Sequence, residues 1–344
     1  MLLLDRGQRE LVVVPNRLKI AGAAVASILA AVTVGTGTAA AQPGRPAPAG
    51  AVITKTVKIN DHRIQLTVKS PVMGKDVNLT VLTPGGSAPR GTLYLLDGAG
   101  ADQPVSDWVT KGGAPQFFAD KDVNVVMPAG GGSTFYTDWQ AADPRYGKPM
   151  WESFLTGELP PLINKTFHGD GRNAIAGLSM GAQAALALTA RHPKLYNGVG
   201  SLSGCPAVSS PVNEGYVTGT VAKDGGISVN MWGPFGSPGW AAHDPSLMVD
   251  RFRGKNVYIY AGSGIPSFND FYTPLEPGQS RQTQLAAGGA LEAGAESCSR
   301  QFSLRLLVAQ IPATVDYPLV GLHSWSYWKA ALPNAWAALA PGLW

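Results

Sequence analysis

The chain has 344 residues, a formal net charge of +4 at pH 7 and a charged fraction of 15%. It carries no basic run or stripe in its main part, which argues against nucleic acid as a partner. Two cysteines and five scattered histidines offer no zinc-ligand spacing, so we expect neither a metal site nor a cofactor.

The N-terminus has the pattern of a secretory signal peptide. Arg17 and Lys19 precede an uncharged stretch over residues 20–41, rich in Ala, Val, Ile and Leu, that ends in three alanines. A basic region, an apolar region and an A-x-A site predict cleavage after residue 41 and export. The alternative is a membrane anchor, because the stretch is about as long as a membrane span. The chain that remains after cleavage would be long enough to bury one large core or two small ones. Its net charge would be near +2.

A Pro/Gly/Ala-rich linker is predicted at residues 42–51, followed by one α/β domain over residues 52–344. Short alternating runs that begin at Val52, Ile64 and Val77 predict antiparallel strands. Later apolar runs alternate with helix-length segments, which is typical of a parallel sheet covered on both faces. These later runs are residues 92–97, 123–128, 173–177, 198–204 and 256–262.

Ser179 lies in a G-x-S-x-G motif between an apolar strand and a small-residue helix. That context is the one in which a sharp turn exposes a nucleophilic serine at a helix N-terminus, where partial positive charge favours an oxyanion. The alternative is a polar residue at a tight strand-to-helix turn. We expect Ser179 to be a nucleophile.

A serine nucleophile needs a base, and His323 is the best placed of the five histidines. It follows a strand-like run and precedes an amphipathic C-terminal helix, and this fold puts the base last in chain order. The other four histidines fit worse. His62 lies in the N-terminal hairpins, and His168 lies in the loop before the Ser179 strand. His192 ends the helix after Ser179, and His243 precedes a proline turn.

The residues alone leave the acid open. Asp270 is attractive because it lies in the loop after the strand at residues 256–262, but several carboxylates fall between the serine and the histidine. The other candidates are Asp244, Asp250, Glu276, Glu292, Glu296 and Asp316.

Two backbone amides are needed to stabilise the oxyanion. One is expected from Met180, directly after the serine. The other is expected from the small-residue loop Gly98–Gly100, which follows the strand that ends at Asp97.

Cys205 and Cys298 are predicted to form a disulfide, because an exported chain folds in an oxidising compartment. The bond would close a loop of roughly 90 residues and contribute on the order of 4 kcal/mol. Two free buried thiols are the alternative.

Seven segments in chain order resemble the mycolyltransferases of the antigen 85 family, in the esterase branch of the α/β-hydrolases. They are "LYLLDGAG", "VNVVMPAGGGSTFYTDW", "MWESFLTGELP", "AIAGLSMGAQAAL", "GSLSG", "NMWGP" and "GLHSWSYW", within about Val77 to Trp336. The resemblance implies a mostly parallel central sheet flanked by helices, with antiparallel N-terminal strands. It also implies transfer of mycolyl groups between trehalose esters, or onto cell-wall arabinogalactan, at the cell-envelope surface.

The resemblance also assigns roles to single residues. Ser179 matches the nucleophile, His323 the base and Glu292 the acid, with Glu296 as the alternative and Asp270 demoted. The oxyanion amides match Ala99 and Met180, and the substrate-contacting positions match Asp97, Ser324 and Trp325.

Three positions depart from the family pattern. Gly100 replaces an arginine, Gly294 a phenylalanine and Ala261 a cysteine, which affects the sugar contacts and the acyl groove more than the triad. The predicted disulfide is also not a feature of the best-known members. Two other functions fit the same chain: a secreted carboxylesterase, and a non-catalytic relative that binds matrix proteins or acts as an adhesin.

Overall fold

Three antiparallel strands begin the fold, as their alternating sequences predict. The computed structural model describes residues 50–275 and 279–344, so the predicted signal peptide and most of the predicted linker lie outside the described residues. The strands are β1 (Val52–Asn60), β2 (Arg63–Ser70) and β3 (Lys75–Leu82), paired in that order. Nearly every residue of β1 is exposed, because it is the edge strand of the sheet.

The predicted parallel sheet continues from these strands. Within the described residues the sheet has nine strands in the order β1-β2-β3-β5-β4-β6-β7-β8-β9, and it is parallel from β5 onward. Strands β4, β5 and β7 are buried along their whole length, which explains their uninterrupted apolar sequences. The remaining bounds are β4 (Arg90–Leu96), β5 (Asn124–Pro128), β6 (Gly169–Leu178), β7 (Gly198–Leu202), β8 (Asn256–Tyr260) and β9 (Thr314–Asp316).

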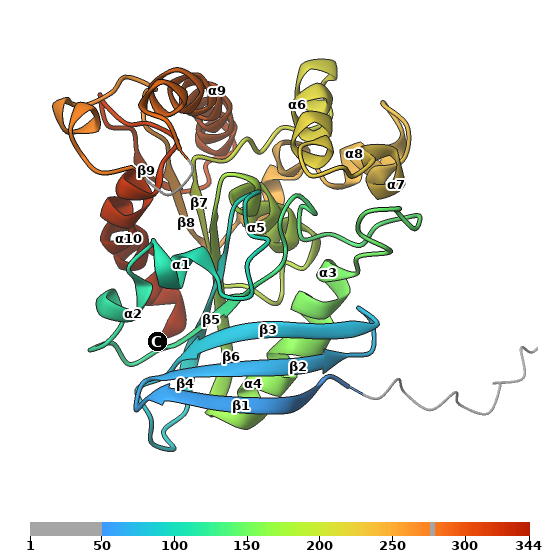
Figure 1. Ribbon diagram of the computed structural model, residues 1–344, viewed down its shortest axis with the longest axis vertical. Coiled ribbons are helices and arrows are strands. Elements are labelled where there is room, and N and C mark those ends of the chain that lie inside the picture. The colour runs from blue at the N-terminus through green and yellow to red at the C-terminus, as the bar shows by residue number, and fades with distance from the viewer. Residues whose placement is uncertain (1–49, 276–278) are drawn as a thin grey trace, which may run out of the picture. The chain divides into compact units, whose positions relative to one another are not determined.

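Helices cover both faces of the sheet (Figure 1). One apolar core packs β4 and β6 against α4, α5 and part of α9, and a second packs the opposite face against α1, α2 and α10. The helices are α1 (Asp107–Thr110), α2 (Ala114–Phe117), α3 (Trp151–Ser153), α4 (Leu159–Phe167), α5 (Met180–Arg191), α6 (Pro211–Ala222), α7 (Ser228–Trp232), α8 (Pro238–Ala242), α9 (Arg281–Val308) and α10 (Trp325–Leu339). A π-helical turn, η1 (Phe154–Glu158), joins α3 to α4, and short 3₁₀ turns are η2 (Pro245–Leu247), η3 (Val249–Phe252), η4 (Phe268–Phe271) and η5 (Ala340–Leu343).

The carboxyl ends of the parallel strands point toward α9 on one side and α6 to α8 on the other (Figure 1). This edge is where open α/β sheets place their ligands, since the loops that leave the strands meet there. Among the helices of the described residues, none has the length and apolar character to cross a membrane.

Candidate active site

Ser179 lies at a sharp turn between β6 and α5. Its backbone has φ +53° and ψ −121°, a conformation that residues other than glycine rarely adopt. The two motif glycines permit this turn: a Cβ on Gly177 would lie 2.3 Å from the Gly181 carbonyl oxygen, and a Cβ on Gly181 would lie 2.3 Å from the Asp97 carbonyl oxygen. The motif therefore requires glycine at both positions because helix and strands approach too closely for any side chain.

The structure brings Ser179, His323 and Glu292 together. The His323 Nε2 atom lies 2.8 Å from Ser179 Oγ, and its Nδ1 lies 2.7 Å from Glu292 Oε2. A carboxylate only accepts hydrogen bonds, so it holds the proton on Nδ1 and leaves the Nε2 lone pair facing the serine hydroxyl. This is the tautomer that a base needs in order to take the serine proton.

The Glu292 carboxylate is fully buried, and its other oxygen is also occupied. Oε1 accepts hydrogen bonds from the Ser203 hydroxyl and from the Gly262 amide, each at 2.6 Å. The indole Nε1 of Trp328 donates to Ser203 Oγ at 2.9 Å. Ser203, Gly262 and Trp328 were not among the predicted site residues, although Ser203 lies in the "GSLSG" segment and Trp328 in the "GLHSWSYW" segment that carry the family resemblance.

The competing carboxylates have other partners. Asp270 accepts from Ser267 and from the Tyr327 hydroxyl and caps η4, so it is not bonded to His323. Glu296 pairs with Arg300 on the outer side of α9. Asp244 accepts hydrogen bonds from Ser209 and Ser246, and Asp250 pairs with Arg253. Asp316 accepts hydrogen bonds from Tyr258 and Asn334, and Glu276 lies outside the described residues.

The competing histidines also lie elsewhere. Of the five, all of which are described, His323 alone hydrogen-bonds Ser179. His62 contacts the Thr83 carbonyl, His168 ends α4 in a left-handed conformation, and His192 and His243 both face Glu152.

The predicted oxyanion amides lie beside the serine. Met180 provides the first N–H of α5, a group that has no acceptor within the helix. Ala99 belongs to the loop after β4, and this loop packs on the serine: a Cβ on Gly98 would lie 3.4 Å from Ser179 Cβ. Both positions suit a donor to a developing oxyanion, and that role stays a prediction.

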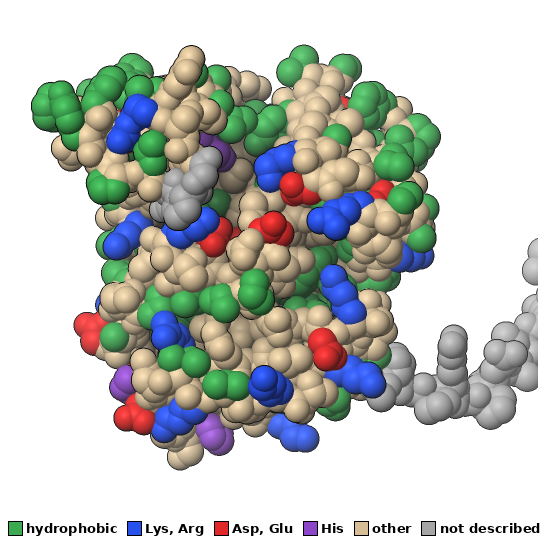
Figure 2. Space-filling view, in the orientation of Figure 1, with side chains coloured by type: hydrophobic (Ala, Val, Ile, Leu, Met, Phe, Trp, Pro, Cys, Tyr) green, Lys and Arg blue, Asp and Glu red, His purple; other side chains and the backbone are tan. Residues whose placement is uncertain are grey.

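A cavity of about 640 Å³ opens above the serine and the histidine. Figure 2 shows the surface hollowed between the part that carries α9 and the part that carries α6 to α8. The cavity has apolar and aromatic walls with a few charged groups: it is lined by Leu178, Tyr216, Leu275, Leu291, Trp325 and Trp328, with Asp107, Lys111, Lys223 and Asp270 among its polar residues. A wall of this mixed kind suits a ligand with a lipid part and a polar head.

Ser324 and Trp325 line this cavity, as predicted for substrate-contacting residues, whereas Asp97 does not. The Asp97 carboxylate is buried and accepts hydrogen bonds from the Ser106 hydroxyl and from the amides of Asp107 and Trp108 at the start of α1. Burial raises the pKa of Asp97 to about 7. In this structure Asp97 anchors the start of α1. A contact between Asp97 and a sugar stays a prediction.

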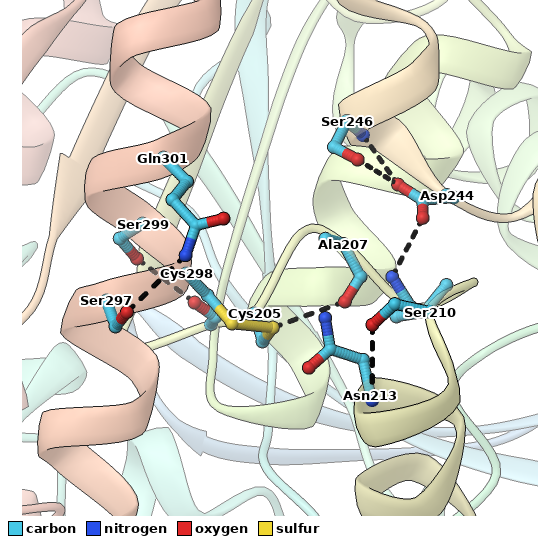
Figure 3. The surroundings of a disulfide bond; sticks show 12 residues. Cys205, Ala207, Ser210, Asn213, Asp244, Ser246, Ser297, Cys298, Ser299 and Gln301 are labelled. Carbon is cyan, nitrogen blue, oxygen red and sulfur yellow. Dashed lines mark hydrogen bonds between the residues drawn. A yellow bond between two sulfur atoms is a disulfide. The ribbon is translucent and has the colours of Figure 1, made fainter. Parts of the chain in front are cut away.

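The predicted disulfide between Cys205 and Cys298 is present. Figure 3 shows it joining α9 to the segment that follows β7. Close by, the Ser299 hydroxyl donates to the Gly204 carbonyl at 3.0 Å. The helix that carries Glu292 is thus fastened to the strand end next to the candidate site.

Residues 50–275 and 279–344 contain no group of three or more His, Cys, Asp or Glu side chains arranged to hold a metal ion.

Comparisons with known proteins agree on the family. A protein-family model described as "Putative esterase" matches residues 70–339. The diacylglycerol acyltransferase/mycolyltransferase Ag85A of Mycobacterium tuberculosis is 32% identical, over 96% of this chain and 93% of that protein. The crystal structure of MPT51 (FbpC1) from the same organism is 28% identical with a TM-score of 0.66, and it covers 80% of this chain and 98% of that one.

A more distant likeness supports the fold alone. An S-formylglutathione hydrolase from Agrobacterium tumefaciens is 18% identical with a TM-score of 0.58, over 83% of this chain and 98% of that one. The predicted α/β-hydrolase architecture is thereby confirmed. The chain belongs to the antigen 85 family of esterase-like α/β-hydrolases.

Proposed function

We propose that this chain is a secreted serine acyltransferase that moves mycolyl groups between trehalose esters, or onto cell-wall arabinogalactan. The observation that carries the proposal is the continuous hydrogen-bonded series from Glu292 through His323 to Ser179, at the base of a cavity, in a chain of this family. The names of its relatives, diacylglycerol acyltransferase/mycolyltransferase, supply the acyl class.

In the first half-reaction, Ser179 Oγ attacks the carbonyl carbon of the donor ester, and its proton passes to His323 Nε2. The amides of Ala99 and Met180 stabilise the negative charge on the carbonyl oxygen. The bond to the donor sugar oxygen then breaks, and His323 returns its proton to that oxygen. This leaves a mycolyl group esterified to Ser179 and releases the sugar.

In the second half-reaction, a hydroxyl of the acceptor attacks the mycolyl carbonyl carbon and gives its proton to His323. The bond to Ser179 breaks, and the proton returns to Ser179 Oγ. Glu292 stabilises the imidazolium in both halves, because its carboxylate is fixed against Nδ1. The sugar takes the place that water takes in an esterase.

Export is part of the proposal. The signal-peptide pattern of residues 1–41 supports it, and so does the disulfide, since such bonds persist in oxidising compartments. We therefore place the reaction at the cell-envelope surface.

The test uses purified protein, trehalose monomycolate and isotope-labelled trehalose, with Ser179→Ala as the matched variant. Label that enters the lipid fraction with the wild type alone supports the proposal. Free mycolic acid without labelled lipid would instead identify a carboxylesterase. If neither product forms, the non-catalytic binding function is favoured.

A further inference from the structure

Ser203 has a backbone conformation that its side chain disfavours. Its φ is +55°, almost the same as the +53° of Ser179, and it lies at the end of the neighbouring strand. Glycine adopts this conformation without strain, whereas a residue with a Cβ does so at a cost. A buried serine held there suggests that its hydroxyl has a function.

The Ser203 hydroxyl stands between two other side chains. It donates to Glu292 Oε1 at 2.6 Å and accepts from Trp328 Nε1 at 2.9 Å. Because an indole N–H only donates, it directs the single serine proton toward the carboxylate. The Trp328 ring also packs edge-on against the His323 ring, with centroids 4.9 Å apart. One tryptophan therefore contacts both partners of the glutamate.

The segment that contains Ser203 is attached to α9 at three successive residues. Ser203 bonds Glu292, the Gly204 carbonyl accepts from Ser299, and Cys205 is bonded to Cys298. Glu292 and Ser299 are seven residues apart, so they lie on the same face of the helix. These contacts fasten α9 to the end of β7, and of the three only the Ser203 bond is made to the Glu292 carboxylate itself.

We propose that Ser203, oriented by Trp328, is a positioning residue that keeps the Glu292 carboxylate aligned with His323. The inference rests on the proposed function of Ser179, His323 and Glu292. With Oε1 held by Ser203 and by the Gly262 amide, Oε2 is the oxygen that faces His323 Nδ1. Without the Ser203 hydroxyl, Oε1 keeps a single donor and the carboxylate can rotate away from the imidazole.

The experiment measures how fast a fluorophosphonate probe modifies Ser179. The serine oxygen attacks phosphorus, fluoride leaves, and the serine proton goes to His323, so the rate reports activation of the serine without any lipid substrate. The main variant is Ser203→Gly, because glycine suits φ +55° and removes the hydroxyl without adding strain. Trp328→Phe removes the N–H donor together with part of the indole ring and keeps an aromatic side chain at this position. Ser299→Ala removes a hydroxyl that also joins α9 to the segment after β7 but does not touch the carboxylate.

We expect Ser203→Gly to slow modification about 10- to 100-fold, as loss of a hydrogen bond to a charged group implies. Trp328→Phe should slow it about 3- to 10-fold, the scale of a neutral hydrogen bond. Ser203→Gly should also lower the pH midpoint of the rate, because a carboxylate that rotates away from the imidazole stabilises the imidazolium less. Ser299→Ala should leave rate and midpoint at their wild-type values.

Equal rates and pH midpoints for wild type and Ser203→Gly would overturn the inference. So would a loss in Ser299→Ala as large as in Ser203→Gly, since that would mark a general effect on folding. If the wild-type protein itself does not react at Ser179, the proposed function fails, which is a different outcome from failure of this inference alone.

Discussion

At the scale of single residues, Asp97 shows how a buried carboxylate connects the sheet to the candidate site. It lies two residues before Ala99, and it is bonded to the first residues of α1 rather than exposed in the cavity. Because burial raises its pKa to about 7, it is protonated in the folded chain over a range where an unfolded aspartate is ionised.

This gives a pH prediction for Asp97→Asn. Between about pH 4 and pH 7 the folded wild type holds a proton that the unfolded chain has lost, so its free energy of unfolding decreases as the pH rises. From pH 5 to pH 7.5, urea unfolding should show the wild type losing about 2–3 kcal/mol more than Asp97→Asn. The same loss in both proteins would contradict the assignment.

At the scale of elements, two features hold the helices that carry the site: the disulfide, and a group of side chains that contact Glu152. For the disulfide, we predict that the double variant Cys205→Ser with Cys298→Ser loses about 2–5 kcal/mol of unfolding free energy, since it frees a long loop in the unfolded chain. Urea unfolding with and without a thiol reductant measures this. The reductant should destabilise the wild type and leave the double variant unchanged; an effect on both would point to another cause.

Glu152 on α3 joins three helices through one buried carboxylate. Arg191 and His192 at the end of α5 contact it at 2.8 and 2.7 Å, and His243 at the end of α8 lies 3.6 Å away. Burial alone would raise the pKa of Glu152, but the hydrogen bonds from His192, His243 and Arg191 outweigh it and hold that pKa well below its usual range. The ionised form therefore stabilises the fold.

We predict that Glu152→Gln loses about 3–5 kcal/mol of unfolding free energy at pH 7, because Arg191 loses its charge partner and the buried group keeps one oxygen acceptor fewer for its other donors. A carboxyl with a lowered pKa stabilises above its unfolded pKa, so the difference from the wild type should shrink as the pH falls below about 4. Glu296→Gln, which removes a more exposed pair with Arg300, is the control and should cost less than about 1 kcal/mol. A gap at Glu152 that stays constant with pH would contradict this account.

At the scale of the whole molecule, the order of the elements was predictable from the sequence. Alternating runs gave the exposed antiparallel strands, and continuous apolar runs gave the buried parallel ones, because the side-chain pattern reports which faces are covered. Ser179 was recognisable from its glycines, whose Cβ positions are blocked by backbone. His323 followed from its place after the last strand.

The carboxylate that bonds His323 was not predictable from spacing. Glu292 reaches His323 from the middle of a long helix, while Asp270, nearer to a strand end, is used by η4. The positive φ of Ser203 and the inward turn of Asp97 depend on neighbours brought together by the fold, so no local pattern indicates them. The family resemblance alone indicated Glu292. The packing of α9 explains why this carboxylate reaches His323.

Gly100 offers a test of the shape of the cavity. It lines the cavity, and no atom lies within 4 Å of the place that a Cβ would occupy. Gly100→Arg should therefore fold with a change in stability within about 0.5 kcal/mol. The added guanidinium can donate to sugar hydroxyls, so we expect a KM for trehalose several-fold lower at unchanged kcat. A higher KM in steady-state transfer assays would show that the open space at Gly100 is itself used by the acceptor.

The most direct test of the central claim is the mass of the Ser179 peptide after the protein has reacted with trehalose monomycolate and been quenched in acid. We predict a mycolyl ester on Ser179 of the wild type and none on the same peptide of Ser179→Ala. When isotope-labelled free trehalose is added, the ester should disappear while labelled lipid forms. Transfer of label by a protein whose Ser179 peptide never gains mass, or by Ser179→Ala at the wild-type rate, would contradict the account.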